Sequence, residues 1–134
     1  MDITSLIPQR EPMIMIDKII GHSDEKTVTS LIIRKTNIFV EEDFFRSSGL
    51  MEHIAQSSAA RMGMETIKQG KKPLLGYIAS IKNLSIIRLP KIGETILTDI
   101  IQTNKINNII VIIGESKIND IVVSSCELKV FIEE

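Results

Sequence analysis

The sequence predicts an α+β domain in which one long helix is wrapped by an antiparallel β-sheet. Residues 48–69 have the length and composition of a helix, whereas apolar runs separated by short polar turns lie before and after them. A single helix in a chain that is otherwise sheet can bury its apolar side only against that sheet, so we expect it at the centre of the core. The length of 134 residues suits one domain, which we assign to residues 1–134.

Before the helix, the pattern predicts a β-hairpin and a loop. A short amphipathic segment, residues 3–7, ends at Pro8. The run MIMIDKII, residues 13–20, is typical of a strand, and the polar stretch GHSDEK after it is typical of a turn. The run TVTSLIIR, residues 27–34, then returns as the second strand. We expect the stretch KTNIFVEEDFFRSSG that follows to be a loop.

After the helix, the pattern predicts only strands. Gly70 stands where a glycine commonly ends a helix. Short polar connections then separate four apolar runs, which are residues 75–88, 95–104, 109–117 and 121–132. Such close spacing favours an antiparallel meander. Apolar residues alternate along the last run and place Cys126 in the core rather than in a reactive site.

Composition excludes several classes of function. The net charge of -1 offers no general attraction for nucleic acid, and the longest aliphatic run, residues 109–113, is far shorter than the roughly 18 residues of a membrane span. The N-terminal residues lack the apolar core of a signal peptide, and one cysteine forms no internal disulfide, so we expect a cytoplasmic protein. The two histidines and the cysteine lack the spacing of metal ligands, and we expect neither a metal nor a cofactor.

The predicted helix has two different sides. One side carries Met51, Ala55, Ala59, Ala60, Met62, Gly63 and Ile67, and the opposite side carries His53, Ser57, Arg61, Glu65 and Lys68. Glu52 lies on the first side, with Gln56 one turn later. A carboxylate among small apolar residues is costly unless it is paired or used. We therefore predict Glu52 as a catalytic acid or base, with Gln56 beside it; the alternative is a carboxylate satisfied by backbone amides or a buried hydroxyl.

The first turn of the helix supplies further candidates. Backbone N–H groups near Gly49, Leu50 and Met51 could polarise a substrate carbonyl, because a helix N-terminus favours negative charge. Adjacent helical residues point about 100° apart, so His53 is expected on the solvated outer face rather than beside Glu52. We expect His22 to be exposed in its hairpin turn.

Three stretches together resemble the 3-hydroxyacyl-[acyl-carrier-protein] dehydratase family. The segment LIPQREPMIMIDKI resembles the family's Leu-Pro-His-Arg-x-Pro motif and the strand that follows it, and GLMEHIAQSSAA resembles its Glu-x-x-Ala-Gln helix motif. The segment GYIASIKNLSIIRLPKIGETI resembles the next strand and turn. The order and spacing of these motifs cover nearly the whole chain and imply the hotdog fold of that family.

The resemblance implies a site at a dimer interface. In this family two protomers join their sheets, and the helix glutamate, here Glu52, acts with a histidine from a His-Phe-Pro-Gly segment before the helix. That segment is absent here, and Gln9 replaces the histidine of the N-terminal motif. Phe44 and Phe45 align with the aromatic residues ahead of the missing segment. We expect substrate binding by Phe45 and by the first-turn residues Gly49, Leu50 and Met51.

Three functions follow as hypotheses. The first is a dehydratase acting on acyl thioesters of acyl carrier protein or coenzyme A in fatty-acid or related lipid or polyene synthesis, with Asp43, Gln56 or a partner chain replacing the histidine. The second is an inactive or accessory subunit that pairs with an active hotdog chain. The third is a thioesterase that uses Glu52 alone. A homodimer or a hetero-hotdog dimer is expected. The basic residues available for an acidic carrier are Arg46, Lys82, Arg88 and Lys91.

Overall fold

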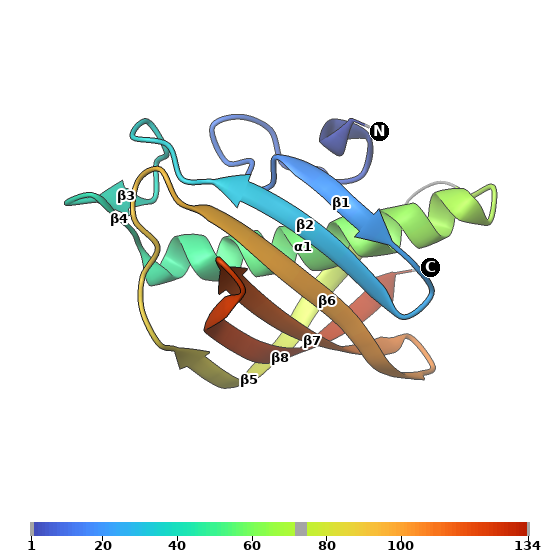
Figure 1. The fold of residues 1–134 in the computed structure, drawn as a ribbon. Coiled ribbons are helices and arrows are strands. Elements are labelled where there is room, and N and C mark those ends of the chain that lie inside the picture. Colours follow the sequence, from blue (N-terminus) through green and yellow to red (C-terminus); the bar gives the residue numbers. More distant parts are fainter. Residues whose placement is uncertain (1, 72–74, 134) are drawn as a thin grey trace.

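The computed structural model describes residues 2–71 and 75–133, which form one long helix and two sheets (Figure 1). The elements in chain order are η1 (Ile3–Ser5), β1 (Lys18–His22), β2 (Lys26–Ile32), β3 (Val40–Glu41), β4 (Phe44–Phe45), α1 (Ser47–Lys68), β5 (Leu75–Ile86), β6 (Thr95–Ile106), β7 (Ile109–Ile118) and β8 (Ile121–Glu133). Among the described residues, no helix is long and apolar enough to cross a membrane.

The main sheet has six antiparallel strands in the order β1-β2-β6-β7-β8-β5. Strands β6, β7 and β8 form the predicted meander. A meander would also place β5 beside β6, but β5 does not pair with β6. It pairs with β8 at the far edge, while β2 pairs with β6. The meander prediction was therefore wrong for residues 75–88, because the connection after this strand leads to the opposite side of the sheet. The apolar runs themselves could not distinguish these two pairings.

The segment before β1 also differs from the prediction. Residues 13–17 lie along the helix, and the ladder of β1 starts only at Lys18. The loop ahead of the helix contains the small hairpin of β3 and β4, whose turn residues Glu42 and Asp43 adopt positive φ angles. The helix itself lies within one residue of its predicted bounds at each end. Gly70 has a φ of 74° and donates its N–H to Ile67 O, as a glycine at a helix end commonly does.

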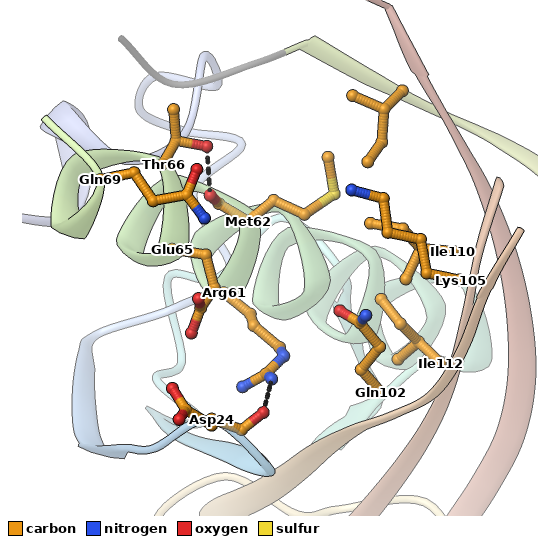
Figure 2. A pocket seen from close by; sticks show the side chains of 11 residues that line it. Asp24, Arg61, Met62, Glu65, Thr66, Gln69, Gln102, Lys105, Ile110 and Ile112 are labelled. Atoms are coloured by element: carbon orange, nitrogen blue, oxygen red, sulfur yellow. Dashed lines mark hydrogen bonds between the residues drawn. The ribbon is translucent and has the colours of Figure 1, made fainter. Parts of the chain in front are cut away.

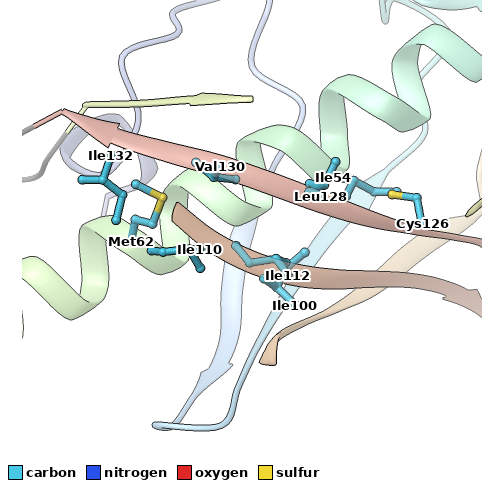
Figure 3. Packing of buried hydrophobic residues seen from close by; sticks show 9 residues of the cluster. All are labelled: Ile54, Met62, Ile100, Ile110, Ile112, Cys126, Leu128, Val130 and Ile132. Atoms are coloured by element: carbon cyan, nitrogen blue, oxygen red, sulfur yellow. The ribbon is translucent and has the colours of Figure 1, made fainter. Parts of the chain in front are cut away.

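The sheet curves around α1, and their contact forms the main core (Figure 1). Ile54 and Met62 of the helix pack against β6, β7 and β8, and Cys126 lies in this same cluster (Figure 3). Burial raises the pKa of the Cys126 thiol to about 11, so the thiol stays protonated and unreactive, as predicted. A second cluster surrounds Phe45 and Leu50 near the start of the helix, and a third joins Ala60 to the N-terminal segment.

The outward side of the helix was predicted incorrectly. His53, Ser57 and Arg61 are buried and face the sheet, not the solvent. The sheet accepts them because its concave face carries buried hydroxyl groups at matching positions. Directly paired residues on four neighbouring strands form a hydroxyl row, which consists of Thr29, Thr98, Ser116 and Ser124. The polar helix side chains lose their contact with water on burial, and hydrogen bonds to buried groups of the sheet take the place of that contact.

Candidate functional site

Glu52 is held at the first turns of α1 by Gln56. The Gln56 Nε2 group donates to Glu52 Oε1 and to Met13 O, each at 2.7 Å, and Gln56 Oε1 accepts from Met15 N at 2.7 Å. Both N–H donors of this buried amide and its oxygen are engaged in these contacts. Gln56 therefore fixes both the carboxylate of Glu52 and the segment that crosses the helix beside it.

The carboxylate of Glu52 is half-buried, less enclosed than the apolar stripe of the sequence suggested. Within the described residues, only Oε1 receives a hydrogen bond, and no lysine or arginine side chain forms an ion pair with the group. The other oxygen, Oε2, accepts no hydrogen bond from the described residues. A carboxylate must lie within hydrogen-bond reach of the proton it transfers, and this oxygen is free of donors in the described part of the protein that would compete for it.

His53 faces the sheet and is enclosed by protein. Its Nδ1 lies 2.6 Å from Met15 O, and its Nε2 lies 2.6 Å from Thr98 Oγ1. A carbonyl oxygen only accepts, so Nδ1 carries the proton and Nε2 accepts from the Thr98 hydroxyl, which accepts in turn from Ser116, 2.8 Å away. Burial lowers the pKa of His53 to about 4 and keeps the ring neutral. The predicted location on the solvated face was wrong.

The second histidine lies at the other end of the helix. His22 is part of β1 rather than an exposed turn, and its side chain contacts Thr27 Oγ1 at 2.7 Å and Glu65 Oε1 at 2.8 Å. Glu65 follows Glu52 by thirteen residues, about 20 Å along a helix. The prediction of an exposed His22 was wrong, and neither histidine of this chain can meet Glu52 in the described fold.

Most of the residues expected to bind substrate are instead buried in the core or hydrogen-bonded within the protein. Phe45 is fully buried and makes an edge-to-face contact with Phe39, with ring centroids 6.3 Å apart; Leu50 belongs to the same cluster. The N–H groups of Gly49 and Leu50 both donate to Arg46 O, so they are not free to polarise a carbonyl as predicted. Met51 is half-exposed and remains a candidate.

Gly49 is required for packing rather than for an exposed amide. A Cβ atom at this position would lie 2.6 Å from Phe39 Cβ and 2.6 Å from the Phe45 ring. The helix start is thereby pressed against the two phenylalanines. This close approach was not predicted from the sequence, although a glycine three residues inside a helix is a signal of such a contact.

The polar residues of the N-terminal motif stabilise the local chain path. Asp17 accepts from Ile32 N at 2.7 Å and from the Arg34 guanidinium at 2.9 Å, which ties the start of β1 to the end of β2. The Arg10 guanidinium donates to the carbonyl oxygens of Ile7 and Gln9. These residues therefore shape the segment that Gln56 and His53 hold.

The basic residues near the start of α1 are largely neutralised. Arg88 makes two hydrogen bonds of 2.8 Å to Glu94, and this pairing lowers the pKa of Glu94 to about 2. Lys91 lies over the Phe44 ring, and Arg46 is 4.0 Å from Glu41. Acidic residues of the β3–β4 turn share this end of the molecule, so it is not uniformly basic.

Comparison with known families identifies the chain. The ApeP-like family, described as ApeP dehydratase, matches residues 1–134. The chain belongs to the ApeP-like dehydratase family. Among curated relatives of this ApeP-like chain, a 3-hydroxyacyl-[acyl-carrier-protein] dehydratase FabZ of Xylella fastidiosa (strain M12) is 23% identical, covering 94% of this chain and 83% of the relative. The FabZ of Lactobacillus helveticus (strain DPC 4571) is 26% identical, covering 95% and 88%.

Solved structures confirm the fold of the ApeP-like chain. The dehydratase heterocomplex ApeI:P from Xenorhabdus doucetiae contains a chain that superposes with a TM-score of 0.92 at 14% identity, covering 100% of this chain and 92% of the other. A hypothetical thioesterase with coenzyme A from Streptococcus pneumoniae TIGR4 gives a TM-score of 0.69 at 12% identity, covering 87% and 84%. The predicted hotdog fold and dehydratase-family membership are confirmed.

Proposed function

We propose that this ApeP-like chain is a subunit of a dimeric dehydratase that removes water from 3-hydroxyacyl thioesters and that Glu52 is its acid–base residue. The observation that carries the proposal is the Gln56-anchored carboxylate, which has one oxygen free of donors and no paired cation among the described residues. The curated FabZ relatives have names that state this substrate class. The pathway proposed is fatty-acid or related lipid or polyene synthesis.

The reaction needs two proton transfers. A base removes the proton on the carbon next to the thioester carbonyl, the carbon–carbon double bond forms, and the C–O bond breaks as the hydroxyl takes a proton and departs as water. His53 is fully buried with both ring nitrogens engaged, and His22 lies about four helical turns beyond Glu52. We therefore propose that the second group comes from a partner chain.

Strand β5 is the proposed dimer interface. It ends the described sheet without a strand on its outer side, over the length of Leu75–Ile86. Several of its apolar side chains are exposed, including Tyr77 at 51% and Leu84 at 44%. A long apolar edge strand is a template for pairing with another chain. The heterocomplex formed by the ApeI:P neighbour supports a hotdog partner, which here is either a second copy or a different hotdog chain.

The proposed substrate carrier is acyl carrier protein or coenzyme A, and the proposed location is the cytoplasm. The FabZ relatives act, by name, on acyl-carrier-protein substrates. The acidic turn residues Glu42 and Asp43 beside Arg46 and Lys91 argue against a simple basic docking surface for an acidic carrier. Recognition is therefore proposed to depend mainly on the thioester and the acyl group.

The decisive experiment measures enoyl product and free thiol separately. Purified protein, alone and with a hotdog partner where one copurifies, is incubated with a 3-hydroxyacyl thioester. A dehydratase gives enoyl-thioester absorbance without thiol release. Glu52→Gln should lower the rate by about a hundredfold or more while preserving the fold, because the amide has nearly the same shape. Glu65→Gln, a control about 20 Å along the same helix, should keep the rate within about twofold. A Glu52→Gln variant with the full rate contradicts the site assignment.

A thioesterase is the second candidate, and the lack of an available histidine in the described part of the chain favours it. One carboxylate suffices to activate water or attack a thioester carbonyl. In the same assay this function gives free thiol without enoyl product. If neither product forms with any partner, the accessory-subunit hypothesis is supported instead, and the proposed dehydratase activity is wrong.

A further inference from the structure

A cavity of about 270 Å³ lies between the C-terminal half of α1 and the sheet (Figure 2), and Glu52 is not among the residues that line it. Four buried apolar residues line it, namely Met62, Ile110, Ile112 and Ile132. They are also members of the main core cluster, so the apolar part of the cavity is lined by core side chains (Figure 3). An engineered cavity of about 150 Å³ holds benzene, so this space admits an aliphatic chain of moderate length.

A buried arginine supplies the polar side of the cavity. Arg61 is 3% exposed, and its terminal nitrogens donate to Ser23 O, Thr27 Oγ1 and Asp24 O. Its Nε–H has no acceptor among the described residues. Figure 2 shows the guanidinium facing the amide of Gln102, which projects from β6 across the cavity. An unsatisfied donor beside a cationic centre is costly, and a ligand oxygen would satisfy it.

The charges around the opening favour an anionic group. Each of the two lining carboxylates lies near a cationic or basic group: Asp24 Oδ1 is 3.0 Å from Lys68 Nζ, and Glu65 Oε1 is 2.8 Å from His22 Nε2, although the geometry of this second contact is not that of a hydrogen bond. Lys105 is exposed at the rim and forms no ion pair within the described part of the chain. The donors in this lining that a ligand oxygen could contact are therefore the Nε–H of Arg61, the side-chain amide of Gln102 and the ammonium group of Lys105.

We propose that this cavity binds an amphipathic monocarboxylate, a fatty-acid-like anion whose aliphatic chain enters the apolar half and whose carboxylate lies between Arg61, Gln102 and Lys105. Arg61 follows Glu52 by nine residues, about 14 Å along the helix, so the site is separate from the proposed catalytic carboxylate. The inference rests on the cavity alone and holds whether or not the chain is a dehydratase.

The test is a binding titration with octanoate on the intact protein, observed through the methyl signals of labelled isoleucine and methionine. We expect saturable shifts at Met62, Ile110, Ile112 and Ile132. Octanol, which has the same chain without the charge, should bind roughly tenfold more weakly, because hydrogen bonds to charged groups are stronger than neutral ones. No turnover is involved, so failure of this test differs from failure of the dehydratase assay.

Two variants outside the buried core test the polar contacts. Lys105→Met should weaken octanoate binding about threefold, the scale of an exposed ion pair, and Gln102→Leu should weaken it further. Lys18→Met, an exposed lysine on β1, is the matched control and should change nothing. The proposal is overturned if octanoate does not saturate, if the shifts occur at other methyl groups, if octanol binds as tightly, or if the Lys105 and Gln102 variants bind like the wild type.

Discussion

Glu52 and Gln56 form one unit at the scale of residues. The amide of Gln56 satisfies the backbone carbonyl of Met13 and the backbone N–H of Met15 and still holds the carboxylate of Glu52. Sequence alone placed these two side chains on one helix face, which the hydrogen bond between them confirms. The sequence did not reveal that Gln56 also binds the backbone of Met13 and Met15, because these hydrogen bonds join positions about forty residues apart.

Replacing Gln56 with leucine should lower the free energy of unfolding by about 3 kcal/mol. The change leaves Met13 O and Met15 N without their partners, and an unsatisfied buried polar group costs about 1–3 kcal/mol. Urea unfolding followed by circular dichroism measures the change. Gln69→Leu, an exposed control at the end of the same helix, should stay within about 0.5 kcal/mol. Equal stabilities for the two variants would contradict the assigned role of Gln56.

His53 should make the protein less stable in mild acid. Its pKa is about 4 in the folded protein, whereas an unperturbed histidine has a pKa of 6.5, so the unfolded chain binds the proton more readily between these values. Stability is therefore full above pH 6.5 and is lost as the pH falls toward 4. We expect a loss on the order of 2 kcal/mol between about pH 7 and pH 5.

The matched variant for this pH dependence is His53→Gln, which cannot titrate. Its free energy of unfolding should be nearly constant between about pH 7 and pH 5, although lower overall than that of the wild type. Glu94, with a pKa of about 2, loses its stabilising effect only as the pH falls below about 4.5 and so does not interfere. If the free energy of unfolding falls equally with pH in the wild type and in the variant, His53 does not cause the acid sensitivity.

At the scale of elements, the helix shows what pattern alone could and could not predict. Its bounds, its terminal Gly70 and the position of Glu52 follow from local sequence. The burial of His53, Ser57 and Arg61 does not, because it depends on polar partners from distant strands. The buried hydroxyls lie on the same strand face as apolar residues, as Thr98 does between Ile96 and Ile100. A hydroxyl residue at such an inward position is the signal by which the polar contact could have been recognised.

The start of the helix should be sensitive to a single added methyl group. Gly49→Ala brings a Cβ within 2.6 Å of Phe39 and Phe45, and we expect a loss of about 2 kcal/mol in the free energy of unfolding, within the usual cost of overpacking. Gly21→Ala meets no atom within 4 Å and should change stability by less than about 0.5 kcal/mol. Thermal and urea unfolding of both variants check the difference. A neutral Gly49→Ala variant would mean that the helix start can shift.

At the scale of the whole molecule, sequence predicted the helix-in-sheet architecture but not the position of β5. The apolar runs and short turns identify strands, whereas their order depends on which edges meet in three dimensions. Placing β5 at an edge has a functional consequence. It exposes a long strand with several apolar side chains, which we propose pairs with a partner chain, and the proposed chemistry needs such a partner because both histidines of this chain are unavailable to Glu52.

Ile81→Lys should therefore dissociate the proposed dimer. Ile81 is a partly exposed residue in the middle of β5, and a lysine there would carry an unpaired charge into an interface formed by this edge. We expect the dissociation constant to rise about tenfold or more by sedimentation velocity, or copurification with a different hotdog chain to be lost if the wild type alone is monomeric. Ile121→Lys makes the same change at a more exposed site beside the β7–β8 turn and should leave assembly intact. If both variants assemble equally well, β5 is not the interface, and the second catalytic group must reach Glu52 by another route.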